Sequence, residues 1–128
     1  MEKKFFAIGS FLAGLAVATG AFGAHGLEKL VSPERLITWE KAARYQIYHA
    51  IALFIVAWAI TQWRDQENSF IVAGWAFILG TILFSGSLYI LVLTDSLKIA
   101  GFNLAYLTPI GGVAYVVGWL MLMKATWK

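Results

Sequence analysis

The sequence contains no cysteine, two histidines and two prolines. Disulfide bonds and thiol chemistry are therefore excluded, and a closed zinc site, which takes four ligands, has too few histidines to form. Charged residues are also scarce, at 13% of the chain against about 25% in an ordinary soluble domain. No CxxC or HExxH motif, phosphate-binding glycine loop or paired nucleophile and base is present. The sequence predicts no enzyme, no metal and no cofactor.

Apolar residues are what the chain has in abundance. They make up 60% of the 128 residues, and the mean hydropathy is +0.73. A single soluble domain of this length could not hide so much apolar surface, which points to lipid as the solvent. Four runs are long enough to cross a bilayer as helices. These predicted spans cover about residues 5–24, 45–63, 70–93 and 104–123.

The segment 33–44 has a different pattern from the spans. Leu36, Trp39 and Ala43 fall on one helical face and charged residues fall elsewhere, as in an amphipathic helix at the membrane surface or an exposed start of the second span. The predicted fold is an all-α integral membrane four-helix bundle, a single domain over residues 1–128, with a short amphipathic helix between spans one and two. Trp39 and Trp119 lie near predicted span ends, where tryptophan favours the membrane interface.

The net charge is +3 and the sequence pI is about 9.3. The basic residues are scattered through loops and tails, so we expect membrane-flanking charge and no nucleic-acid partner. Each side of the predicted topology carries five Lys or Arg residues, counted as Lys3, Lys4, Arg64, Lys124 and Lys128 against Lys29, Arg35, Lys41, Arg44 and Lys98. Lys3 and Lys4 flank the first span, which favours cytoplasmic termini.

Small residues recur at steps of three and four along the spans. Such seams let helix backbones approach closely in lipid. The predicted helix-packing positions are Gly9, Ala13, Ala16, Gly20, Gly23, Gly80, Gly111 and Gly118. We expect them to mediate helix contacts, in a homo-oligomer or with a membrane-protein partner.

Polar side chains within the spans gather toward one side of the membrane. The first and third loops share that side, and polar groups in lipid should turn toward one another inside the bundle. The predicted polar pocket consists of His25, Tyr45, Gln46, His49, Ser85, Ser87, Tyr89 and Thr108.

Four blocks of residues resemble the signature segments of a known family. They are Gly20-Ala21-Phe22-Gly23-Ala24-His25-Gly26-Leu27, Ala43-Arg44-Tyr45-Gln46-Ile47-Tyr48-His49-Ala50, Phe84-Ser85-Gly86-Ser87-Leu88-Tyr89, and Thr108-Pro109-Ile110-Gly111-Gly112 with Gly118-Trp119. The chain is similar to the YgdD/YwdK-like family of small bacterial membrane proteins, domain of unknown function 423. The resemblance implies a four-helix membrane protein and assigns no activity. In the third loop this chain has Asp95 after the threonine, where the family pattern leads us to expect glycine.

Three hypotheses for function follow. The first is a non-enzymatic oligomer or accessory or scaffold subunit with a one-sided polar pocket. The second is a small-solute or proton transporter or channel. The third is a haem- or metal-binding module that uses His25 and His49.

Overall fold

The computed structural model describes residues 1–99 and 101–127. Ala100, in the third predicted loop, and Lys128, one of the lysines counted for orientation, lie outside the described residues. The helices and strands are α1 (Glu2–His25), α2 (Pro33–Gln62), α3 (Glu67–Gly80), a π-helical segment (Thr81–Ser85), α4 (Gly86–Thr94), β1 (Lys98–Ile99), β2 (Phe102–Asn103) and α5 (Leu107–Thr126). Short 3₁₀ turns occupy Leu27–Lys29, Arg64–Gln66 and Leu104–Tyr106.

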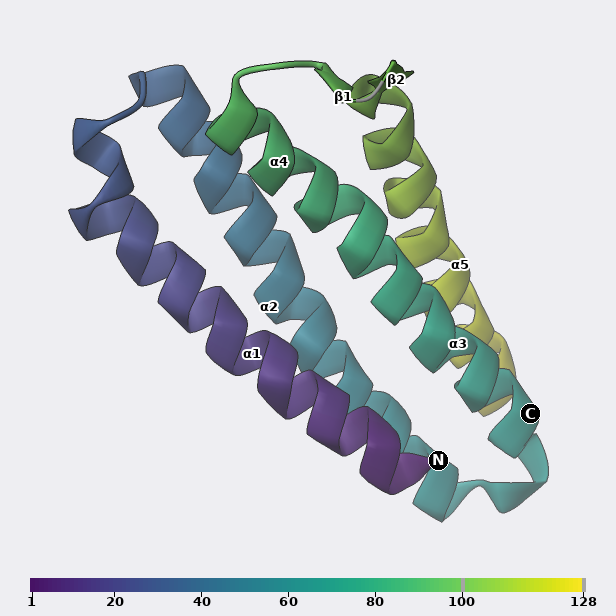
Figure 1. The fold of residues 1–128 in the computed structure, drawn as a ribbon. Helices are drawn as coiled ribbons and strands as arrows, with labels where there is room; N and C mark the ends of the chain where they lie inside the picture. The colour runs from purple at the N-terminus through teal and green to yellow at the C-terminus, as the bar shows by residue number, and fades with distance from the viewer. Residues whose placement is uncertain (100, 128) are drawn as a thin grey trace.

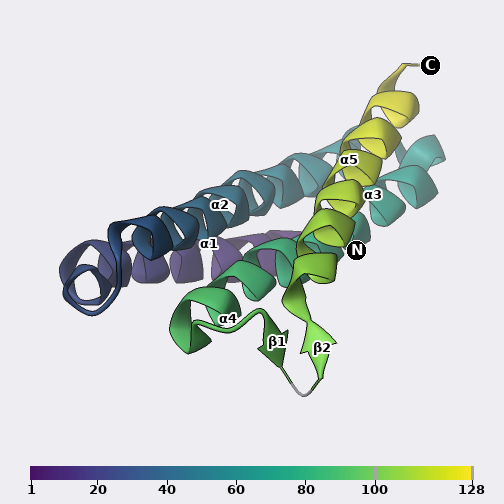
Figure 2. The same ribbon diagram turned by 90° about the horizontal axis from the view of Figure 1, so that it is seen from above.

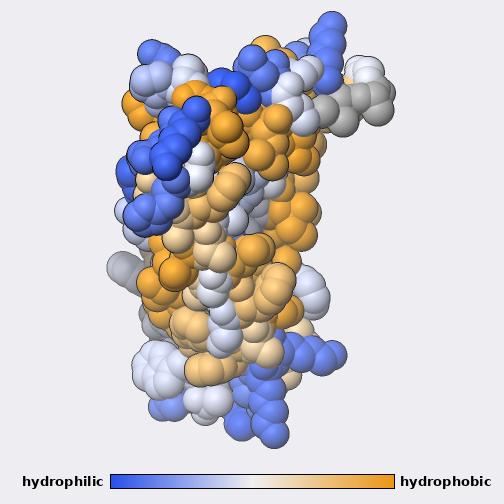
Figure 3. All heavy atoms as spheres, turned by 60° about the vertical axis from the view of Figure 1, so that its left-hand side comes forward, coloured by the Kyte–Doolittle hydropathy of each residue, from blue (hydrophilic) through white to orange (hydrophobic). Residues whose placement is uncertain are grey.

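Four helical stretches are long and apolar enough to cross a membrane, which confirms the predicted number of spans. The third is one continuous rod made of α3, the π-helical segment and α4. Both chain ends lie at the same end of the bundle, and β1 and β2 lie at the other (Figure 1). The face drawn in Figure 3 shows a hydrophobic band between two hydrophilic ends, as expected for a protein embedded in lipid.

The predicted amphipathic helix between spans one and two is wrong as a separate element. Residues 33–44 are the first part of α2, which runs unbroken from Pro33 to Gln62. Ser32 caps this helix, because its hydroxyl accepts a hydrogen bond from the backbone N–H of Arg35 (3.3 Å) and proline follows in the first turn. The backbone is helical on both sides of the predicted boundary at residues 44 and 45, so the helix continues into the bundle.

Arg35 ties the start of α2 to the end of α4. Its guanidinium donates to the backbone carbonyl of Val92, one of the last α4 carbonyls, which have no partner within their own helix. Its Nε also lies 3.6 Å from a carboxylate oxygen of Asp95. Asp95 has φ 50° and ψ 35°, the left-handed conformation that favours glycine. This left-handed backbone explains why glycine is expected at position 95. Aspartate is one of the few other residues that adopt this conformation.

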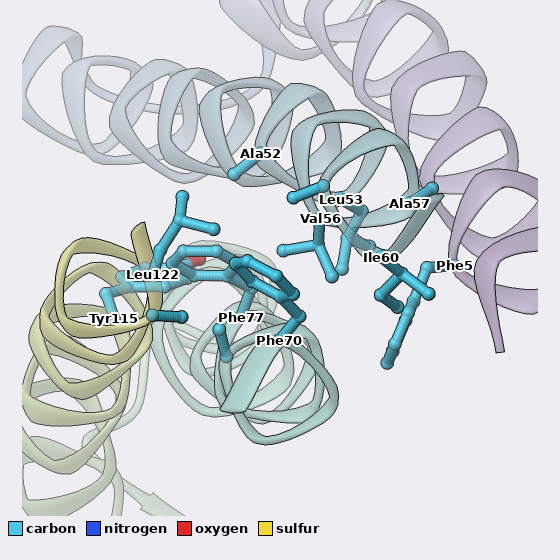
Figure 4. Close-up of a cluster of buried hydrophobic side chains, with 13 residues drawn as sticks. Phe5, Ala52, Leu53, Val56, Ala57, Ile60, Phe70, Phe77, Tyr115 and Leu122 are labelled. Atoms are coloured by element: carbon cyan, nitrogen blue, oxygen red, sulfur yellow. The ribbon is translucent and has the colours of Figure 1, made fainter. Parts of the chain in front are cut away.

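The helices associate as two pairs. In the view from above, α1 lies along α2, while α5 crosses beside α3 (Figure 2). Between the pairs lies an apolar core, where Leu53, Val56 and Ile60 of α2 meet Phe70 and Phe77 of α3 (Figure 4). All five side chains are fully buried. This core occupies the half of the bundle nearer the chain ends and leaves the polar side chains to the other half.

Candidate functional site

A chain of hydrogen bonds joins α1, α2 and α4 in that second half. The hydroxyl of Tyr89 donates to the side-chain oxygen of Gln46 (2.8 Å), and the amide of Gln46 donates to the carbonyl of Leu12 (2.9 Å). The hydroxyl of Thr19 lies 3.0 Å from that of Tyr89. Trp39 donates from its indole N–H to the carbonyl of Thr19 (2.7 Å). These four side chains hold α1 and α4 to α2 through bonds that hydrocarbon cannot replace.

The direction of these bonds follows from proton counting. Each hydroxyl has one hydrogen. Since Tyr89 gives its hydrogen to Gln46, the contact between Thr19 and Tyr89 is a bond only if Thr19 donates. The bonds from Tyr89 onward run from Tyr89 to Gln46 to Leu12. The Thr19 hydroxyl also lies 3.1 Å from the carbonyl of Ala16, so its one hydrogen is shared between that carbonyl and Tyr89. Such chains polarise each member and strengthen the whole.

His49 lies at the centre of an aromatic cage formed with α3 and α5. Its ring stacks on that of Tyr115, with centroids 3.4 Å apart and planes 8° apart. Its Nδ1 lies 2.7 Å from the carbonyl of Tyr45, and its Nε2 lies 3.2 Å from the indole Nε1 of Trp119. Because a carbonyl only accepts and an indole N–H only donates, the cage fits one form of the ring: neutral, with the hydrogen on Nδ1.

The hydroxyls of the third rod use both local and long-range partners. Ser85 donates to the carbonyl of Ala42 in α2 (2.7 Å), and Tyr115 donates to Thr81 (3.2 Å). Ser87 lies 2.6 Å from the hydroxyl of Thr108 and 2.9 Å from the carbonyl of Phe84. One hydrogen per hydroxyl is enough if Thr108 donates to Ser87 and Ser87 donates to Phe84. The π-helical segment thus lies where three helices exchange hydrogen bonds.

The predicted polar pocket divides into three groups and one outlier. Gln46 and Tyr89 belong to the hydrogen-bond chain, while His49 and the backbone carbonyl of Tyr45 belong to the aromatic cage. Nearby, Ser85 bonds the π-helical segment to α2, and the pair Ser87 and Thr108 connects α4 to α5. His25 is exposed at the end of α1, 13 residues beyond Leu12, which is about 20 Å at 1.5 Å per residue. It does not share a site with His49.

The predicted pocket left out five polar or aromatic members of the site: Thr19, Trp39, Thr81, Tyr115 and Trp119. Trp39 and Trp119 were expected at the membrane interface. Trp39 is buried instead, and both use their indole N–H inside the bundle. The spacing of Trp39 and His49 along α2 does not predict their hydrogen bonds, because their side-chain partners come from α1 and α5.

Most of the predicted glycine contacts lie inside the chain. A Cβ at Gly9 would lie 2.9 Å from the carbonyl oxygen of Ala50, and one at Gly23 would lie 2.7 Å from the ring of Trp39. Gly80 contacts Tyr115, Gly118 contacts Phe77, and Gly111 contacts the backbone at Leu83 and Phe84. Ala16 is buried and Ala13 half-buried. Gly20 differs, because nothing lies within 4 Å of its would-be Cβ. The small residues thus bring helices of one chain together.

A hollow of about 430 Å³ opens between α1 and the π-helical segment with α4; we call it the α1–α4 groove. Gln46 of α2 lines it together with polar Thr81, Ser87 and Tyr89. The apolar lining comes from Leu12, Leu15, Ile82, Leu83, Gly86, Ile90 and Leu107. Three residues of the predicted pocket therefore reach one cavity.

Metal ligands do not cluster in the part of the chain that the structure describes. No group of three or more His, Asp, Glu or Cys side chains that could hold a metal ion occurs within residues 1–99 and 101–127. Both ring nitrogens of His49 already have partners. A metal at His49 would have to displace Trp119 or the Tyr45 carbonyl.

Comparison with known proteins places the chain. The family model described as protein of unknown function (DUF423) matches residues 19–112. A UPF0382 membrane protein of Staphylococcus aureus is 48% identical over 126 residues, 98% of this chain and 97% of that protein. The UPF0382 membrane protein YwdK of Bacillus subtilis is 42% identical over 126 residues, 98% of each chain. No solved structure matches. This chain, a multi-pass membrane protein, therefore belongs to the UPF0382 (DUF423) family, the YwdK-like family that its four signature blocks resemble.

Proposed function

We propose that this protein is a non-enzymatic accessory or scaffold subunit that acts inside the bilayer, on a second copy of itself or on another membrane protein. The connections between spans are short: residues 26–32, residues 63–66, and the turn that carries β1 and β2. They offer little surface to a water-soluble partner. The large available surface is the outside of the helices.

One outer face carries the proposal. We define the outward stripe of α2 as the exposed residues Ile37, Glu40, Lys41, Arg44, Tyr48 and Ile51, which follow one another at helical spacing. Arg44 is two residues from Gln46, which is bonded to Leu12 near the middle of the apolar run of α1. The backbone of Arg44 therefore lies well inside the apolar band.

Charged side chains at that depth either extend to the membrane surface or pair with a partner. Among residues 1–99 and 101–127, the ion pairs are Met1 with Glu2 and Arg35 with Asp95, and Arg44 has no ion pair with any of these residues. Glu40 and Arg44 lie one turn apart on the stripe. Two parallel copies facing each other across a two-fold axis could pair these residues reciprocally. Arginine and tyrosine side by side are also typical of contact centres.

Cross-linking tests this proposal directly, since the chain has no native cysteine. Tyr48→Cys and Ile37→Cys, labelled with a photoreactive maleimide in native membranes, should capture a second copy or one defined protein. Val113→Cys, exposed on α5, is the matched control. Capture from the two stripe positions no greater than from the control refutes the proposal.

The transport hypothesis needs a polar route through both leaflets. Among the described residues, the half of the bundle nearer the chain ends is closed by the apolar core of Leu53, Val56, Ile60, Phe70 and Phe77. Proton or solute flux in reconstituted vesicles above that of empty vesicles would favour transport over an accessory role.

Orientation remains a separate part of the proposal. Lys3 and Lys4 at the start of α1 support cytoplasmic termini in a bacterial inner membrane. A thiol at Ser69→Cys, near the start of α3, should then be labelled by an impermeant maleimide only in inverted vesicles.

A further inference from the structure

The α1–α4 groove has the size of a small-molecule site. Its volume is about 430 Å³. Small-molecule sites generally run from about 300 to 1,000 Å³. Its size therefore suits a small ligand.

The groove opens to lipid. Leu15, Ile82 and Ile90 on its lining are 41%, 62% and 42% exposed, so its rim faces outward from the bundle. Leu12 and Leu15 lie near the middle of α1, and Gln46 lies 13 residues into α2, about 20 Å from its first residue. This depth belongs to the hydrocarbon, so an occupant must come from the lipid phase.

Gln46 gives the groove a hydrogen-bond donor. The residue is only 2% exposed, and its amide oxygen accepts from Tyr89 while one N–H donates to Leu12. A primary amide carries two N–H hydrogens. Within residues 1–99 and 101–127, the second N–H has no acceptor. A buried donor without a partner in an apolar cavity favours any ligand that supplies an acceptor.

We propose that the α1–α4 groove binds a neutral, membrane-soluble carbonyl compound of the quinone type. Its carbonyl oxygen accepts the second N–H of Gln46, and its apolar body lies against Leu12, Leu15 and Ile82. Phospholipid ester carbonyls lie at the edge of the hydrocarbon, about 15 Å from its centre. Gln46 is level with the middle of α1. A carbonyl that reaches it therefore belongs to a molecule dissolved within the bilayer. This site does not depend on the accessory role proposed above.

Binding can be followed through Trp39. Its ring centroid lies 4.6 Å from that of Tyr89, which lines the groove, and quinones quench indole fluorescence. The probes are decylubiquinone and decylbenzene, which has the same chain and no carbonyl. Wild-type protein in detergent should show saturable quenching with decylubiquinone, at least tenfold tighter than with decylbenzene. Trp39→Phe should abolish the saturable part and identify the reporter.

Two variants locate the site. Gln46→Leu removes the donor and should weaken decylubiquinone binding at least tenfold. Because it also breaks the bonds to Leu12 and Tyr89, Ile82→Trp is the second test: it fills the groove from an exposed rim position and should abolish saturable binding in a folded protein. Val116→Trp, 57% exposed on α5, is its control and should bind normally. Equal affinity for the two probes, or normal binding by Ile82→Trp, overturns the proposal.

Discussion

Gly111 offers the sharpest test of how α5 packs. The nearest atoms to a Cβ at this position are backbone atoms of the third rod: the carbonyl carbon of Leu83 and the Cα of Phe84 would lie 2.9 Å away, and the nitrogen of Phe84 closer still. Ordinary contact begins at about 3.4 Å. Gly111→Ala therefore forces α5 outward by about 0.5 Å or more, since no side chain there can rotate away. Overpacking of this kind costs about 1–3 kcal/mol.

The neighbouring glycine is a matched control. A Cβ at Gly112 meets nothing within 4 Å, and the residue is in the same helix. Alanine there gains up to about 1 kcal/mol of helix propensity with no clash. We expect the two alanine variants to differ by about 2 kcal/mol, or about 5–10 °C in Tm on the scale of small domains. Thermal unfolding in one detergent measures this, and equal Tm values would refute the packing argument.

Three further predictions concern other parts of the bundle. His49→Ala should lower the free energy of unfolding by about 2 kcal/mol or more, because it removes the stack on Tyr115 and leaves the indole N–H of Trp119 unpaired. His25→Ala should change the free energy of unfolding by less than about 0.5 kcal/mol, and chemical unfolding that ranks the two variants equally would contradict this. Asp95→Val should destabilise more than Asp95→Gly, since both lose the ion pair with Arg35 but valine also resists a φ of 50°; an equal or reversed order of Tm would refute the role of the left-handed backbone. Gly20→Leu should leave the packing of α1 on α2 intact, because nothing lies within 4 Å; a changed elution volume or a fall in Tm would reveal a contact made by a second copy.

The number and place of the membrane spans could be predicted from the sequence, because lipid leaves an apolar run few alternatives to a helix. Long apolar runs must form helices there, and their lengths predicted four spans with ends within a few residues of those observed for α1, α3 with α4, and α5. The start of α2 was missed for a physical reason. Charges from Glu34 to Arg44 read as a surface segment, yet the helix has no cause to stop at residue 44, and its outer face carries those charges.

The candidate site was predictable in part. Grouping polar residues by membrane side placed Gln46 with Tyr89 and Ser87 with Thr108, and each of these pairs is within hydrogen-bond distance in the structure. The split between the hydrogen-bond chain and the aromatic cage was not predictable. It depends on which way each helix is rotated, and that is set by glycine contacts with backbone and rings. His25 was grouped with the rest by side alone, which ignores distance along the bundle.

The π-helical segment determines which changes of length the third span tolerates. Its wider turn lets Gly80 meet Tyr115 on one flank while Ser85 reaches Ala42 on another. Deleting one residue from 81–85 and restoring ordinary helical winding would leave Ser87 and Tyr89 facing Thr108 and Gln46, because five residues of π-helix turn about as far as four of α-helix. Deleting one residue within α4 has no such compensation and would rotate the residues after it by about 100°. A one-residue deletion should therefore be tolerated better at 81–85 than in α4.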